Sequence, residues 1–303
     1  MREVTNHPRP QKSCEFQNHH MDSTRWNDFE HRDDDIVIAT WVKSGTTWMQ
    51  QIIGQLLFKG AEDLPVMDIC AWLDLRILPQ EDVYENLANQ THRRFIKTHL
   101  PAHTIPINPN VKYVFVVRDG RDALWSWHHH HSQCTDALYE AVNETPGLVG
   151  DPLPKPNPDI VEYFREWLEK DGYPIWPLFS NIKSWWDIRD LPNVLLVHFN
   201  ELKNDLSGQM RRVAAFLEIP VDETLWPTQV EHCSFEYMKT HAETLTPMLE
   251  QMFSGGGKAF INKGTNARWR DALTEEDVRN YESRALRELG PECAKWLATG
   301  ERT

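Results

Sequence analysis

One short segment combines the residue types that could hold a phosphate-like group. Positions 43–47 read KSGTT, which places a lysine and three hydroxyl side chains around a glycine. The run before it, IVIAT, predicts a buried strand, whereas the residues after it repeat at three- and four-residue spacing and predict an amphipathic helix. Unpaired N–H groups at the start of a helix attract anions. The sequence therefore predicts an anion site at Lys43, Ser44, Gly45, Thr46 and Thr47.

A lysine and a histidine follow a second apolar segment. Residues 94–99 read RFIKTH, and Pro101 ends the pattern, which predicts a short strand that finishes in Lys97 and His99. Open α/β sheets carry functional groups at the carboxyl ends of their strands. Histidine titrates near working pH and is the commonest general base. A single histidine is more often a packing residue, but the strand-end position beside Lys97 favours a catalytic role.

An arginine follows the clearest strand of the chain. The run KYVFVV at 112–117 predicts a third strand, and Arg118 stands directly after it, before a helical pattern. A guanidinium offers a planar fork of donors to a phosphate. Ser126 comes about two helical turns later and could reach the same group. We interpret Arg121 and Asp122 as a structural ion-pair network.

Four consecutive histidines at 128–131 raise the question of a metal site. Consecutive helical residues point in different directions, so at most two could share a ligand face. No cysteine or carboxylate spacing completes a site. We therefore predict no metal and assign these histidines to the wall of a pocket or to the surface.

The composition limits the classes of function. The chain has 303 residues, 40% of them hydrophobic and 25% charged, which is typical of a globular protein. Its net charge of −13 argues against a general nucleic-acid or anionic-membrane binder. The 5 cysteines fit reduced thiols in the cytoplasm, and the sequence shows no signal peptide and no run of membrane-span length. We predict a cytoplasmic protein without a nucleic-acid partner or a membrane span.

Taken together, the motifs resemble those of the PAPS-dependent sulfotransferases of the soluble, cytosolic type. KSGTTW at 43–48 matches the family's 5′-phosphosulfate loop, although Trp41-Val42 replaces its usual Tyr-Pro. KTHLP at 97–101 matches the catalytic motif, and 116–126 matches every fixed position of the 3′-phosphate motif VVRxxRDxxxS. The closing motif RKGxxGxWK is matched at Lys263, Gly264 and Trp269, with departures at Asn262, Ala267 and Arg270.

The resemblance covers about residues 35–270 and implies a fold and a reaction. The fold is a single α/β domain at 35–303, with a central parallel sheet flanked by helices and a P-loop-like nucleotide site, after an N-terminal arm at 1–34 that we expect to be loose. The alternation of strands and helices, including VLLVHF at 194–199, predicts the same architecture. The reaction is transfer of a sulfuryl group from 3′-phosphoadenylyl sulfate to a hydroxyl or amine, by in-line displacement and without a metal. The product nucleotide is adenosine 3′,5′-bisphosphate.

The resemblance also implies residue roles. His99 is the general base, Lys97 neutralises the sulfuryl oxygens, and Lys43 stabilises the bridging oxygen. Ser126 holds Lys43 until the acceptor binds. Arg268 partly replaces the guanidinium missing at Asn262. The implied nucleotide contacts are Trp48 and Phe235 on the adenine, Phe199 where many relatives carry Tyr, Cys233 where many carry Thr, Arg118 and Ser126 at the 3′-phosphate, and Asn262, Lys263 and Gly264 over it.

Two other classes of function stay open. A P-loop-type nucleotide or small-molecule kinase would need the GK[ST] motif, which is missing, and a magnesium-binding carboxylate. A non-catalytic nucleotide-binding protein would keep the loops, but the intact Lys43, Lys97 and His99 argue against it. The 13 tryptophans suggest an aromatic or apolar alcohol, a phenol or a lipid-linked sugar as acceptor. A homodimer is possible, although the dimer motif of cytosolic relatives is only partly present, at Thr274 and in the charge of Arg270.

Overall fold

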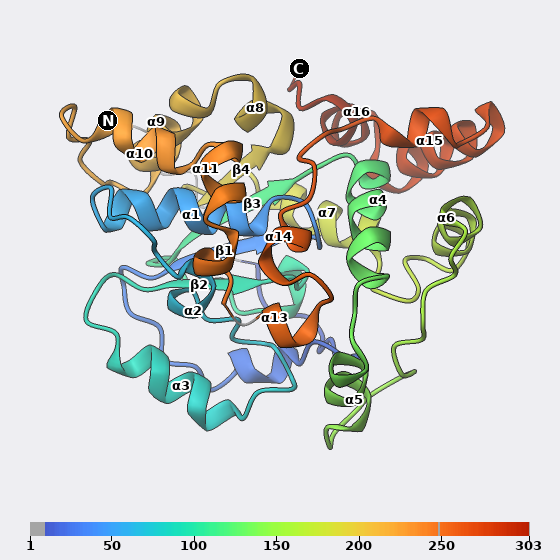
Figure 1. Cartoon of the computed structure of the whole chain (residues 1–303), viewed down its shortest axis with the longest axis horizontal. Helices are drawn as coiled ribbons and strands as arrows, with labels where there is room; N and C mark the ends of the chain where they lie inside the picture. Colours follow the sequence, from blue (N-terminus) through green and yellow to red (C-terminus); the bar gives the residue numbers. More distant parts are fainter. Residues whose placement is uncertain (1–9, 248, 303) are drawn as a thin grey trace.

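A four-stranded parallel sheet organises the chain in the computed structural model, which describes residues 10–247 and 249–302. The strands are β1 (Ile36–Thr40), β2 (Phe95–Thr98), β3 (Lys112–Val117) and β4 (Val194–His198), in the order β2-β1-β3-β4. Ile36 pairs with Phe95 on one side and with Lys112 on the other. Helices surround the sheet (Figure 1). The predicted fold class is confirmed.

Alternating strand residues divide the core into two layers. Ile36 and Ile38 point to the face covered by α1 (Thr46–Leu57), α9 (Leu206–Phe216) and α10 (Trp226–His232). Val37 and Ala39 point to the opposite face, where the packing is rich in tryptophan. The helices of that face are α4 (Gly120–His131), α6 (Ile160–Glu169), α7 (Leu178–Asp187), α15 (Glu275–Leu289) and α16 (Pro291–Thr299).

The strand order brings the predicted functional residues to one edge. β1 lies between β2 and β3, and ligands bind beside the carboxyl ends of strands where the order reverses. β4 ends at His198, one residue earlier than predicted, because His198 and Glu201 form a capping box that starts α8 (Phe199–Asn204). Phe199 therefore lies on the first turn of a helix at the same edge.

Short elements complete the chain. The stretch 241–258 contains the short helices α12, α13 and the start of α14, and Gly256 and Gly257 are buried. None of the described helices has the length and apolar character needed to cross a bilayer. The remaining elements are η1 (Ser23–Trp26), α2 (Val66–Ile69), α3 (Gln80–Asn89), η2 (Ala102–Thr104), α5 (Asp136–Glu144), α11 (Phe235–Thr240), α12 (Ala242–Leu245), α13 (Leu249–Met252), α14 (Gly256–Phe260) and η3 (Arg268–Asp271).

The N-terminal segment is packed rather than loose over the part that the structure describes. Met21 and Trp26 are buried in the tryptophan-rich layer. The Arg25 guanidinium donates to three backbone carbonyls between positions 75 and 78. The polar residues that suggested a loose arm thus bind the neighbouring backbone. Residues 1–9 lie outside the described residues.

Candidate active site

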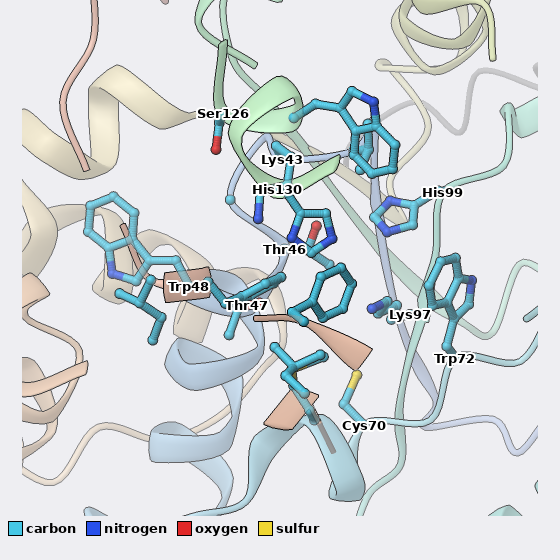
Figure 2. Close-up of a pocket in the computed structure, with 18 of the residues that line it drawn as sticks. Lys43, Thr46, Thr47, Trp48, Cys70, Trp72, Lys97, His99, Ser126 and His130 are labelled. Carbon is cyan, nitrogen blue, oxygen red and sulfur yellow. The ribbon is translucent and has the colours of Figure 1, made fainter. Parts of the chain in front are cut away.

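A cavity of about 800 Å³ opens at the carboxyl ends of the strands. Figure 2 shows Lys43, Lys97, His99 and Ser126 converging on it from different segments. Two predicted site residues, Ser44 and Cys233, do not line it. The predicted residues that do line it are Lys43, Gly45, Thr46, Thr47, Trp48, Lys97, His99, Arg118, Ser126, Phe199, Phe235, Asn262, Lys263 and Gly264.

The KSGTT turn has a backbone that suits an anion cradle. Lys43 and Gly45 both have positive φ, 59° and 115°, so the chain turns sharply before α1 begins at Thr46. A Cβ at position 45 would lie 3.2 Å from a ring carbon of Phe199, so glycine is also needed for close packing. A lysine whose backbone lies in the left-handed region is strained, and strained backbone conformations of this kind are common at ligand sites.

Two lysines face the cavity without a carboxylate partner. Nζ of Lys43 lies 3.7 Å from the ring centroid of Phe260, and Nζ of Lys97 lies 4.2 Å from that of Trp72. The ion pairs of the described residues include neither lysine. Burial, with Lys97 and Arg118 nearby, lowers the pKa of Lys43 to about 7, and burial lowers that of Lys97 to about 8. Unpaired buried cations favour an anionic ligand.

His99 is held in one tautomer. Its Nδ1 lies 2.9 Å from the backbone oxygen of Thr40, which can only accept, so Nδ1 carries the proton. The Thr40 hydroxyl also lies 2.9 Å from Nδ1 and 2.7 Å from the hydroxyl of Thr46. Burial, reinforced by Lys97, lowers the pKa of His99 to about 3. Nε2 is therefore an unprotonated acceptor on the cavity side of the ring.

A buried carboxylate that the sequence analysis missed positions the residues around Lys97. Asp74 accepts hydrogen bonds from the indole N–H groups of Trp72 (2.6 Å) and Trp26 (2.8 Å) and from the Thr98 hydroxyl (2.5 Å). Trp72 in turn lies edge-on to His99, with ring centroids 4.9 Å apart. Burial raises the pKa of Asp74 to about 6. Its position in a segment without regular spacing gave no signal.

Arg118 lies at the predicted strand end but is already hydrogen-bonded. Its Nε and Nη2 donate to the side-chain oxygen of Asn266 at 2.9 and 2.6 Å, and its guanidinium carbon lies 4.4 Å from the ring centroid of Phe199. Burial lowers the pKa of Arg118 to about 10. The arginine thus joins β3 to the segment 262–270 at the cavity.

The segment 262–270 fits closely over one side of the cavity. Gly264 has φ of 61°, and a Cβ there would lie 2.8 Å from the Phe235 ring. The backbone N–H of Ala267 donates to Asp122 at 2.6 Å. Nε of Arg268 is buried without a partner among the described residues, and Arg268 lines the cavity. A buried donor of this kind suits an anion.

We expect Ala267→Gly to raise the free energy of unfolding by about 0.5–1 kcal/mol. Ala267 has φ of 65°, a conformation that strains every residue with a Cβ. The strain energy that is removed from the folded state exceeds the free energy by which the extra conformational entropy of glycine stabilises the unfolded chain. Urea unfolding would measure the change. The matched control is Ala272→Gly, at φ of −121°, which should destabilise the protein; equal losses in both variants would contradict the prediction.

Trp48 is held by the backbone of Cys233, the residue whose side chain was predicted to contact the nucleotide. Its Nε1 donates to the carbonyl of Cys233 at 2.8 Å, and its ring meets Phe199 edge-on at 5.3 Å. The Cys233 side chain is fully buried in the layer beneath α1. The Ser44 hydroxyl is also buried, with no partner among the described residues. The side chains of Cys233 and Ser44 are thus not brought to the cavity.

The other half of the cavity is mainly apolar and aromatic. It is bordered by Trp127 on α4, by Trp176 just before α7 and by His20 from the N-terminal segment. Among the four consecutive histidines only His130 lines it, whereas His131 bonds to the Tyr163 hydroxyl. The described residues contain no group of three or more potential metal ligands. The tryptophan content had suggested such a pocket, and His130 forms part of its wall.

Three comparisons with known proteins bear on this site. The sulfotransferase domain family model matches residues 33–290. A glycolipid sulfotransferase of Mycobacterium tuberculosis is 28% identical, with 93% of each chain covered, and sulfotransferase 1E1 of Homo sapiens is 27% identical, with 84% of each covered. A mouse sulfotransferase complexed with PAP superposes with a TM-score of 0.66 at 21% identity, covering 90% of this chain and 91% of that one. Retinol dehydratase in complex with androsterone and the inactive cofactor PAP gives 0.67 at 24% identity, covering 88% and 84%.

Proposed function

The chain belongs to the sulfotransferase domain family, and on that premise we propose that it transfers a sulfuryl group from 3′-phosphoadenylyl sulfate to a hydroxyl of a small aromatic or apolar acceptor. An amine acceptor is a variant of the same chemistry. The observation that carries the proposal is one cavity in which an unprotonated His99 Nε2 faces two unpaired lysines. We further propose that the enzyme is cytoplasmic. We also propose that it forms a homodimer, because the dimer motif of cytosolic relatives is partly present near Thr274.

The residues of the nucleotide side fit the donor. Lys43 and Arg118 supply positive charge at the ends of two neighbouring strands, and the start of α1 supplies free N–H groups. Arg268 offers a buried donor that lacks a partner among the described residues. Trp48 and Phe235 both line the cavity and would hold the adenine. When bound, the donor supplies an activated sulfuryl group attached to a phosphate leaving group.

The chain's residues would then act on the acceptor and on developing charge. His99 Nε2 takes the proton of the acceptor hydroxyl as its oxygen attacks sulfur. Lys97 neutralises charge on the sulfuryl oxygens, and Lys43 donates to the bridging oxygen, which keeps the electron pair of the broken S–O bond. Ser126 restrains Lys43 before the acceptor arrives. Asp74 is a positioning residue, because it fixes Trp72 against Lys97 and His99.

A donor-dependence assay tests the proposal. Purified protein is incubated with radiolabelled 3′-phosphoadenylyl sulfate, or with ATP and magnesium, and a panel of phenols, steroids and glycolipids. Sulfated product with the first donor supports the proposal. Tight binding of adenosine 3′,5′-bisphosphate without turnover by any acceptor would favour a non-catalytic nucleotide-binding protein, and phosphorylated product would favour a kinase.

We expect Arg268→Ala to weaken binding of adenosine 3′,5′-bisphosphate by about 10- to 150-fold, because a hydrogen bond to a charged group is worth roughly 1.5–3 kcal/mol. The reason is that Arg268 would take the place of the guanidinium absent at Asn262. The matched control is Arg270→Ala, an exposed arginine of the same segment, which should change affinity less than twofold. Calorimetric titration measures both, and equal affinities in the two variants would contradict the role of Arg268.

The pH dependence of kcat/KM should show a fall on the alkaline side only. This quantity reports groups of the free enzyme, in which Lys43 and Lys97 have pKa values of about 7 and about 8. Raising pH through that window removes their charge. His99, with a pKa of about 3, stays unprotonated above pH 5. Values of kcat/KM measured from pH 5 to 10 check this prediction. It would be contradicted if the wild-type kcat/KM also fell on the acidic side, near pH 6.5, and if this acidic fall were absent in a His99 variant.

A further inference from the structure

A second imidazole faces the apolar and aromatic half of the cavity, which we call the acceptor half because the proposed acceptor would bind there. One of its ring nitrogens has no hydrogen-bond partner among the described residues. His20 is 8% exposed and lines the cavity. Its Nδ1 bonds to Nδ1 of His19, and the hydrogen bonds of the described residues include none to its Nε2. The segment that carries it, before β1, contributes none of the residues that act on the donor.

The protonation of His20 follows from its neighbour. His19 Nε2 lies 2.8 Å from the backbone oxygen of Pro174, so Nε2 of His19 carries the proton. Burial lowers the pKa of His19 to about 4 and that of His20 well below its usual value, so both rings are neutral at pH 7. His19 Nδ1 is then the acceptor and His20 Nδ1 the donor. Nε2 of His20 is left as a bare lone pair that needs a hydrogen-bond donor.

His20 lies close to the reacting centre. The rings of Trp72 and Trp176 border both imidazoles: their centroids lie 4.9 and 5.8 Å from that of His99, and 6.4 and 6.2 Å from that of His20. One small ring system seated among these indoles would reach both histidines. The two acceptor nitrogens would then take hydrogens from two separate groups of one molecule.

His130 adds a second polar group at this place. It packs against Trp127 with centroids 5.4 Å apart, and His20 meets the same indole at 6.5 Å. The hydrogen bonds of the described residues include none to either of its ring nitrogens. Figure 2 shows His130 pointing into the cavity beside Lys43 and Thr46. The acceptor half of the cavity is thus not uniformly apolar.

We propose that the acceptor carries a second hydroxyl or other N–H or O–H donor besides the sulfated one, and that His20, assisted by His130, recognises it through the open nitrogen Nε2. The inference rests on the proposed function, because it names the class of acceptor: diols, dihydroxyaromatics or partly hydroxylated ring systems. A monohydroxylated hydrocarbon would leave Nε2 without a partner.

Matched ligands test the inference by equilibrium binding, which needs no turnover. The probes are positional isomers of dihydroxynaphthalene, each paired with its monomethyl ether, which lacks one O–H donor but is larger by a methyl group, and with the naphthol that lacks the same hydroxyl and is smaller. For at least one isomer, calorimetry of the wild-type protein should show the diol binding about tenfold tighter than its ether. The preference should fall below threefold in His20→Phe.

The controls separate recognition from folding and from the proposed reaction. His128→Phe should keep the full preference, since His128 bonds to the carbonyl of Asn157 and does not line the cavity. If His20→Phe does not fold, because it leaves His19 Nδ1 without its donor, His130→Phe decides. A wild-type protein without any preference overturns the inference, and so does a preference that survives in a folded His20→Phe or, where that variant does not fold, in His130→Phe. A preference that holds without any sulfation overturns the proposed function alone.

Discussion

Replacing His99 with asparagine is expected to lower kcat by about 10²–10⁴-fold, the usual contribution of a general base. The asparagine amide can still donate to the Thr40 carbonyl, as Nδ1 of His99 does, so the local packing around β1 is kept. What it lacks is an acceptor at the position of Nε2. The reaction would then depend on water to remove the proton. Initial rates with saturating donor and acceptor measure the change.

Two further measurements make the His99 result specific. His128→Asn, on the cavity-facing helix α4 but outside the cavity lining, should retain full activity. Binding of adenosine 3′,5′-bisphosphate to His99→Asn should stay within threefold of wild type, because the histidine acts on the acceptor. A variant with more than a tenth of wild-type kcat would show that another group takes the proton.

The placement of these side chains at the strand ends was predictable from sequence because its signals are local. The KSGTT turn, Lys97-Thr98-His99 and Arg118 each follow a short apolar run, and a parallel sheet brings such positions to one edge. The tautomer of His99 was not predictable, because it depends on the Thr40 carbonyl, 59 positions away in the chain. The same holds for Trp48, which is fixed by a carbonyl 185 positions away.

The residues of the acceptor half were largely unpredictable from sequence, again because contacts between distant parts of the chain bring them together. His20 and Trp72 come from segments without strand periodicity, and Trp176 lies between helices α6 and α7, in a stretch whose sequence pattern had indicated helix. Only tertiary packing brings the three residues to His99. The N-terminal segment was predicted to be loose from its polar composition. In the folded chain those polar groups bind carbonyls, as Arg25 does, or each other, as His19 and His20 do. Composition alone does not separate a solvated polar segment from one that is hydrogen-bonded internally.

Replacing Lys43 with methionine should lower kcat by about 10²–10³-fold, the typical effect of removing one preorganised group at a site of developing charge. Charge grows on the bridging oxygen only as the S–O bond breaks, so the ammonium acts mainly in the transition state. The affinity for adenosine 3′,5′-bisphosphate should therefore fall by much less than kcat. Equal losses in the two quantities would show that Lys43 only binds the ground state.

The same variant should be more stable than the wild type, which separates a catalytic loss from misfolding. Burial and the nearby cations Lys97 and Arg118 lower the pKa of Lys43 to about 7, so the folded state disfavours the charged form. This penalty is fully present below pH 7 and disappears as pH rises toward the ordinary pKa of lysine. At pH 6 the Tm of Lys43→Met should accordingly exceed that of the wild type. Lys155→Met, which removes an exposed lysine 3.8 Å from the Tyr139 ring centroid, should change neither kcat nor Tm. A Lys43 variant that loses both activity and stability would mean that the lysine supports the fold rather than the reaction.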